Sequence, residues 1–140
     1  MNSIQEIQEE IIEEFAFFTD WTERYEHIIN LGKELEAIDE QHKTEDNLIK
    51  GCQSRVWLHA GRNADGTIHY TADSDAILTK GIIALMIRVF TNQKPEDIVN
   101  ADTSFIDTIG LKEHLSPTRA NGLVSMVKQI KFYALAMQAT

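Results

Sequence analysis

Apolar residues recur at every third or fourth position near the N-terminus, which is the spacing of one face of an α-helix. Ser3 and Glu6 stand at the positions of a capping box, whose side chains bind free backbone amides at the start of a helix. Asp20 and Glu23 repeat such a cap, and a second helix is expected to end at Gly32. The apolar stripes of these two predicted helices are Ile4, Ile7, Ile11, Ile12 and Phe15, then Tyr25, Ile28, Ile29 and Leu31.

A strict alternation of apolar and polar side chains replaces the helical spacing after residue 55. Such alternation is typical of a β-strand with one buried face. It runs from Val56 to Ala60 and returns from Thr67 to Asp73, and turn-forming residues lie between them, from Asn63 to Gly66. The pattern therefore predicts an antiparallel hairpin. A third strand is expected over residues Asn47 to Gly51.

A third helix is predicted directly after the hairpin. Asp73 and Asp75 are suitable N-cap residues for it, and the helical spacing continues to about Phe90. The middle of this helix, from Gly81 to Ile87, is apolar on every side. A helix of that kind is buried, so we expect it at the centre of the core.

Two prolines mark the starts of later helices, since proline suits the first helical position. Pro95 opens a short helix and Pro117 opens the last one. The order of elements predicts an α+β fold in a single domain over residues 1–140, with a small antiparallel sheet and helices packed on one of its faces. The inner stripe of the last helix is Leu123, Met126, Val127, Ile130, Tyr133, Ala134 and Met137.

Charge and composition narrow the range of partners. The net charge is −9, from 22 acidic and 13 basic residues, so a nucleic-acid backbone would be repelled on average. The most apolar stretch, Gly81 to Phe90, is much shorter than the ~20 residues that span a bilayer. The N-terminus has no basic run followed by an apolar stretch, and we expect a cytoplasmic protein with no membrane partner.

The chain contains one cysteine, Cys52. A single cysteine rules out a disulfide within the chain and argues against a cysteine-based metal site. Two interpretations stay open from local context, a small apolar core residue or a reactive thiol. Gly51 permits a sharp turn before the cysteine, and Gln53 and Ser54 follow it with polar groups.

A cysteine–histidine pair is a further arrangement to consider, since it could make a hydrolase or transferase nucleophile. His59 lies seven residues along the strand from Cys52, about 23 Å if fully extended, so the two cannot pair locally. His114 could approach only through the fold. The sequence has no phosphate-binding glycine loop, metalloprotease helix motif or serine nucleophile elbow.

Several ordered segments resemble one family. The segment from Gly51 to Trp57, GCQSRVW, is similar to the signature of the SufE/CsdE family of sulfur acceptors. The resemblance continues in the same order as in the family and covers nearly the whole chain. Its other segments are Trp21, Arg24 and Tyr25 with Leu31 and Gly32, then residues 73–76, 80–84, 95–100 and 115–123 with Met126.

The resemblance implies a sulfur-transfer role and an α+β fold related to the IscU scaffold. Proteins of this family dock on a pyridoxal-phosphate cysteine desulfurase of the SufS or CsdA type, take its persulfide sulfur onto one cysteine, and pass it to a scaffold such as SufBCD. By this resemblance Cys52 carries the sulfur and the free protein is a monomer. The chain itself needs no cofactor and no metal, because thiol–persulfide exchange requires only a thiolate and access to it.

The resemblance also implies roles for the neighbours of the cysteine. We expect Gly51, Gln53 and Ser54 to shape its loop, and Arg119 to stabilise the sulfur anion from the positive end of the last helix. Asp73 and Asp75 are simple helix caps or contacts to the desulfurase. Two alternatives remain, a binding module of the desulfurase system that transfers no sulfur, and a free-standing cysteine enzyme that works without a desulfurase.

Overall fold

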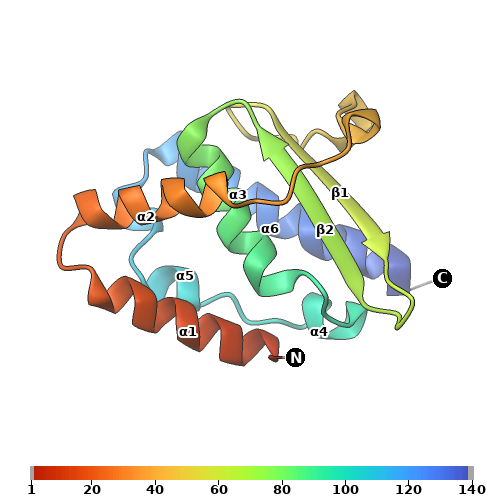
Figure 1. Ribbon diagram of the computed structural model, residues 1–140, viewed down its shortest axis with the longest axis horizontal. Coiled ribbons are helices and arrows are strands. Elements are labelled where there is room, and N and C mark those ends of the chain that lie inside the picture. Colours follow the sequence, from red (N-terminus) through yellow and green to blue (C-terminus); the bar gives the residue numbers. More distant parts are fainter. Residues whose placement is uncertain (1, 139–140) are drawn as a thin grey trace.

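A computed structural model describes residues 2–138, and Figure 1 shows the arrangement of its elements. Two helices, α1 and α2, precede the hairpin of β1 and β2, and the chain ends in the long helix α6 (Figure 1). Three single turns of 3-10 helix lie at Glu40–His42, Glu45–Asn47 and Lys112–His114. The remaining bounds are α1 Ile4–Phe17, α2 Trp21–Lys33, β1 Val56–Arg62, β2 Ile68–Ser74, α3 Ile77–Phe90, α4 Pro95–Val99, α5 Phe105–Thr108 and α6 Pro117–Gln138.

The predicted starts of four helices are confirmed. Ser3 and Glu6 form both hydrogen bonds of the capping box before α1, and the Asp20 side chain accepts from the Glu23 backbone N–H before α2. Pro95 and Pro117 are the first residues of α4 and α6. Each of these signals acts within one helical turn, so the local sequence is sufficient to place it.

The start of α3 differs from the prediction. Ala76 is the N-cap and no side chain caps the helix, so the expectation that Asp73 and Asp75 cap it is wrong. The Asp73 carboxylate instead forms ion pairs with Lys43 at 2.7 Å and Lys80 at 3.3 Å. The Asp75 carboxylate accepts a hydrogen bond from the Arg55 backbone N–H at 3.1 Å. These contacts with Lys43, Lys80 and the Arg55 backbone take the place of the expected caps.

The hairpin lies where the alternating pattern predicts it. Val56 pairs with Ser74 and Arg62 with Ile68, and Gly66 closes the turn with φ of 89°. The predicted third strand is wrong, because residues 47–51 contribute only an isolated bridge between Leu48 and Trp57. Within residues 2–138 the sheet therefore has two strands.

The helices cover one face of the hairpin, as Figure 1 shows for α3 and α6, and the α+β prediction is confirmed. Tyr70 of β2 reaches through the core and donates a hydrogen bond to the Ile130 carbonyl of α6 at 2.7 Å. The middle of α3 is buried from Gly81 to Ile87, as its composition predicts. On the opposite face of the sheet, the segment before β1 lays His42 flat against His59, with ring centroids 3.6 Å apart.

Candidate functional site

Cys52 lies at the open end of the hairpin, in the loop that leads into β1. Gly51 before it has φ of 92°, a conformation that residues with a side chain rarely adopt. A Cβ atom at Gly51 would also lie 2.6 Å from the Ser125 hydroxyl of α6. The turn therefore requires glycine, while the Ser125 hydroxyl could rotate to admit a Cβ atom.

The thiol of Cys52 rests directly on the backbone of α6. Its Sγ atom donates a hydrogen bond to the Gly122 carbonyl at 3.6 Å. A Cβ atom at Gly122 would lie 3.4 Å from Sγ, at the edge of ordinary van der Waals contact, so the sulfur lies close against the helix backbone. Burial raises the pKa of the Cys52 thiol, and a carbonyl acceptor likewise favours the protonated form. The undocked protein thus holds a neutral, half-buried thiol.

A cavity of about 20 Å³ adjoins the thiol. That volume holds about one water-sized atom. Gln53, Ser54 and Arg119 line it together with Cys52, while Asp73 and Asp75 do not. The structure therefore brings the first three of these predicted neighbours to one place. The other lining residues, which the sequence did not mark for the site, are Thr79 and Ile82 of α3 and Thr118, Gly122 and Met126 of α6.

Arg119 is exposed and stands in the first turn of α6. Its backbone N–H donates to the Ser116 hydroxyl at 3.3 Å, a bond that helps to close the start of the helix. The side chain is the one cation among the residues that line the cysteine cavity. It can therefore supply positive charge at the rim without filling the cavity.

The two aspartates lie beside the site rather than in it. Asp75 is exposed and tied to the backbone of Arg55, three residues from Cys52. Partial burial acts to raise the pKa of Asp73, but hydrogen bonds from Lys43, the Ser74 N–H and Lys80 outweigh it and lower that pKa. Asp73 therefore anchors the segment before the cysteine loop to the hairpin and to α3.

The histidines take no part in this site. His59 stacks on His42, and His114 stacks on Trp21, with ring centroids 3.9 Å apart. No histidine is among the residues that line the cysteine cavity. Residues 2–138 also contain no cluster of three or more histidine, cysteine or acidic side chains that could hold a metal ion.

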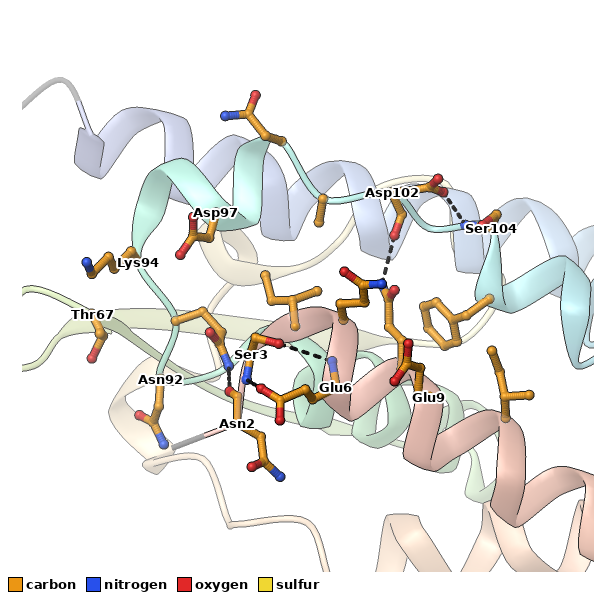
Figure 2. A pocket seen from close by; sticks show the side chains of 18 of the residues that line it. Asn2, Ser3, Glu6, Glu9, Thr67, Asn92, Lys94, Asp97, Asp102 and Ser104 are labelled. Atoms are coloured by element: carbon orange, nitrogen blue, oxygen red, sulfur yellow. Dashed lines mark hydrogen bonds between the residues drawn. The ribbon is translucent and has the colours of Figure 1, made fainter.

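A second hollow, of about 1030 Å³, lies at the other end of the hairpin. Figure 2 shows it between the first turns of α1 and the connection from α4 to α5, with the carboxylates of Glu9, Asp97 and Asp102 around it. Asp65 and Thr67 of the hairpin turn also line it. It shares no residue with the cysteine cavity, from which the seven residues of β1 separate it.

Comparison with known proteins places the chain in a family. The family model SufE, described as Fe-S metabolism associated domain, matches residues 9–134. The chain belongs to the SufE family. It is 39% identical over 127 residues to an uncharacterized SufE-like protein of Rhizobium meliloti (strain 1021), covering 88% of this chain and 91% of that protein. The predicted resemblance is thereby confirmed, and the protein is one of iron–sulfur metabolism.

A solved structure supports the fold of this SufE-family chain. The solution structure of a hypothetical protein from Thermus thermophilus superposes with a TM-score of 0.80 at 16% sequence identity. The superposition covers 96% of this chain and 97% of the other. At that identity the likeness concerns the fold. Among the helices of residues 2–138, none is long and apolar enough to cross a bilayer.

Proposed function

We propose that this SufE-family protein accepts sulfur from a cysteine desulfurase of the SufS or CsdA type. Cys52 carries the sulfur as a persulfide and passes it to a scaffold such as SufBCD for iron–sulfur cluster assembly. The pyridoxal phosphate of the overall reaction belongs to the desulfurase. The observation that supports this proposal best is the cavity beside the Cys52 thiol, which has room for about one further atom.

The transfer step needs no oxidant or metal. The Cys52 thiolate attacks the terminal sulfur of the desulfurase persulfide, and a new S–S bond forms on Cys52. The S–S bond of the desulfurase breaks, and its cysteine leaves as a thiolate that takes up the proton given by Cys52. Because the chain has a single cysteine, no second thiol of the protein can discharge the product as a disulfide.

The neighbours of Cys52 support its loop, supply positive charge and contact the desulfurase. Gly51, Gln53 and Ser54 hold the loop, and Arg119 provides positive charge for the persulfide anion at the rim of the cavity. Asp75, exposed beside the loop, and Asp73, which anchors the segment before it, belong to the face that meets the desulfurase. Arg119→Ala should slow the transfer without unfolding the protein, and Arg119→Lys should retain part of the rate.

Intact-protein mass spectrometry tests the central claim. The protein is mixed with a desulfurase and free cysteine, without reductant, and its mass is compared with that of Cys52→Ser. Added sulfur on the wild type alone supports the proposal, whereas no added sulfur with desulfurases of either type overturns it. If Cys52→Ser still stimulates the desulfurase fully, the protein is a binding module and the transfer role is lost.

A further inference from the structure

Thr79 stands out among the residues around Cys52 because it is polar and buried. It is the third residue of α3 and only 6% exposed. It lines the cysteine cavity from the side of α3, beside the apolar Ile82, while Gly122 and Met126 line it from α6. A valine would fill the same space, so packing alone gives no reason for a hydroxyl there.

Within residues 2–138, no protein group forms a hydrogen bond with the Thr79 hydroxyl. In the described residues, no side-chain nitrogen or oxygen is both sealed from solvent and unpartnered. The hydroxyl therefore borders accessible space, and the space that Thr79 lines is the cavity beside the Cys52 thiol.

We propose that Thr79 binds the transferred sulfur. Its hydroxyl donates a hydrogen bond to the terminal sulfur of the Cys52 persulfide when that atom occupies the cavity. This inference rests on the proposed function of Cys52 as the sulfur carrier. The persulfide is anionic once ionised and needs donors, and the Gly122 carbonyl that holds the resting thiol is only an acceptor.

The α3 and α6 sides of the cavity contribute different interactions to the bound persulfide. From α3, Thr79 donates a short-range hydrogen bond inside the cavity, and from α6, Arg119 contributes charge at the exposed rim. The resting thiol donates to the Gly122 carbonyl instead, so the Thr79 hydroxyl is not engaged by Cys52 before sulfur arrives. It is therefore free to donate to the persulfide in the loaded protein.

The test loads Cys52 chemically, without a desulfurase. Cys52 is first converted to its mixed disulfide with thionitrobenzoate, and sulfide then displaces thionitrobenzoate and leaves the persulfide on Cys52. The rate of persulfide alkylation is measured against pH, and the apparent pKa of the persulfide is read from the profile. Thr79→Val should weaken the acid dissociation of the persulfide about fivefold, because a hydrogen bond to the anion is lost.

Two further variants make the result specific. Thr79→Ser keeps the hydroxyl and should restore the wild-type profile. Thr71→Val is the matched control, because Thr71 is a half-buried threonine of β2, opposite His59 and outside the cavity, and it should leave the profile unchanged. If the persulfide pKa of Thr79→Val equals that of the wild type and of Thr71→Val, the proposal is overturned.

A second measurement uses the wild-type chain alone. Loading with persulfide should shift the NMR signal of the Thr79 methyl group and leave that of Thr71 in place, and an unmoved Thr79 signal contradicts the proposal. Neither measurement includes a desulfurase. A Thr79 effect together with failed enzymatic transfer would therefore overturn the proposed function, while successful transfer without a Thr79 effect would overturn only this inference.

Discussion

At the scale of single residues, the environment of Cys52 depends on a residue with no side chain. Gly122 lets the sulfur rest on α6 and offers its carbonyl to the thiol. Gly122→Ala places a methyl group 3.4 Å from the present position of Sγ, at the edge of ordinary contact, and should shift the thiol outward by a few tenths of an ångström. Since burial raises the pKa of Cys52, displacement should lower that pKa. Alkylation by iodoacetamide near neutral pH should then speed up about twofold, as a pKa drop of about 0.3 unit implies.

Gly61→Ala is the control variant for this prediction. Gly61 lies on β1, and the nearest atom to a Cβ there is 3.9 Å away, so this variant should alkylate like the wild type. Thermal unfolding of both variants checks that the fold is retained. A Gly122→Ala protein that is folded and alkylates at the wild-type rate across the pH range would show that Gly122 does not govern the thiol.

Only some of the residues around Cys52 can be predicted from the sequence. Gln53 and Ser54 adjoin Cys52 in the chain, and Arg119 came from a segment that resembles the family; the roles of all three remain predictions. Gly122 and Thr79 were not predicted as site residues, although Gly122 lies in one of the resembling segments. Their contact with the cavity depends on how α3 and α6 pack, and Gly122 is 70 residues from Cys52 in the chain.

At the scale of elements, a helix start can be predicted from the sequence when the residues that fix it lie within the same helical turn. Ser3, Asp20, Pro95 and Pro117 act within their own helical turns, and their helices begin where expected. The start of α3 lies later than expected, because Asp73 pairs with Lys43 and with Lys80 of α3 and the N-cap position falls on Ala76. In the segment of residues 47–51, where a strand is expected, only Leu48 forms a β-bridge, with Trp57 of β1.

The crossing of α2 and α3 brings two helix backbones into close contact. Gly81 packs on the backbone of α2, where a Cβ atom would lie 2.7 Å from the Ile28 carbonyl carbon and closer still to its oxygen. Gly81→Ala should force the helices apart and lower the free energy of unfolding by about 3 kcal/mol. Urea unfolding measures the loss, which would appear although alanine favours the helical backbone over glycine. Wild-type stability in this variant would mean that the crossing is not tight.

A second contact between elements predicts a pH dependence. Glu14 of α1 accepts hydrogen bonds from Arg88 of α3 and pairs with His27 of α2 at 2.9 Å. The hydrogen bond from Arg88 lowers the pKa of Glu14. A carboxyl group whose folded-state pKa is lowered stabilises the fold above its ordinary value, and the stabilisation is lost as the pH falls through the folded-state pKa.

Glu14→Gln should therefore reduce the free energy of unfolding at pH 7 by about 1 kcal/mol, a modest value because the pair is partly exposed. The difference from the wild type should shrink as the pH falls below the usual range for a glutamate and vanish in acid. Urea unfolding at pH 7 and at a series of acidic values checks this. A difference that stays constant with pH would mean that the charge of Glu14 does not contribute.

At the scale of the whole molecule, the burial of the Cys52 thiol conflicts with the exposure that sulfur transfer to or from a partner requires. The undocked protein keeps the Cys52 thiol half-buried, hydrogen-bonded to α6 and raised in pKa. Sulfur transfer needs an exposed thiolate within reach of a second protein. The proposed function therefore requires that docking weaken the contact between the cysteine loop and α6.

Alkylation in the docked complex tests that requirement. A desulfurase whose own reactive cysteine is replaced by serine can dock without transferring sulfur, and adding it should accelerate the alkylation of Cys52 by a small reagent such as iodoacetamide. The acceleration should be smaller in Gly122→Ala, because that substitution already displaces the thiol. Complex formation is confirmed separately by gel filtration, and the Gly61→Ala chain should respond as the wild type does. If Cys52 is equally protected in the free and the docked protein, docking does not release the thiol, and the acceptor would have to react from its buried position.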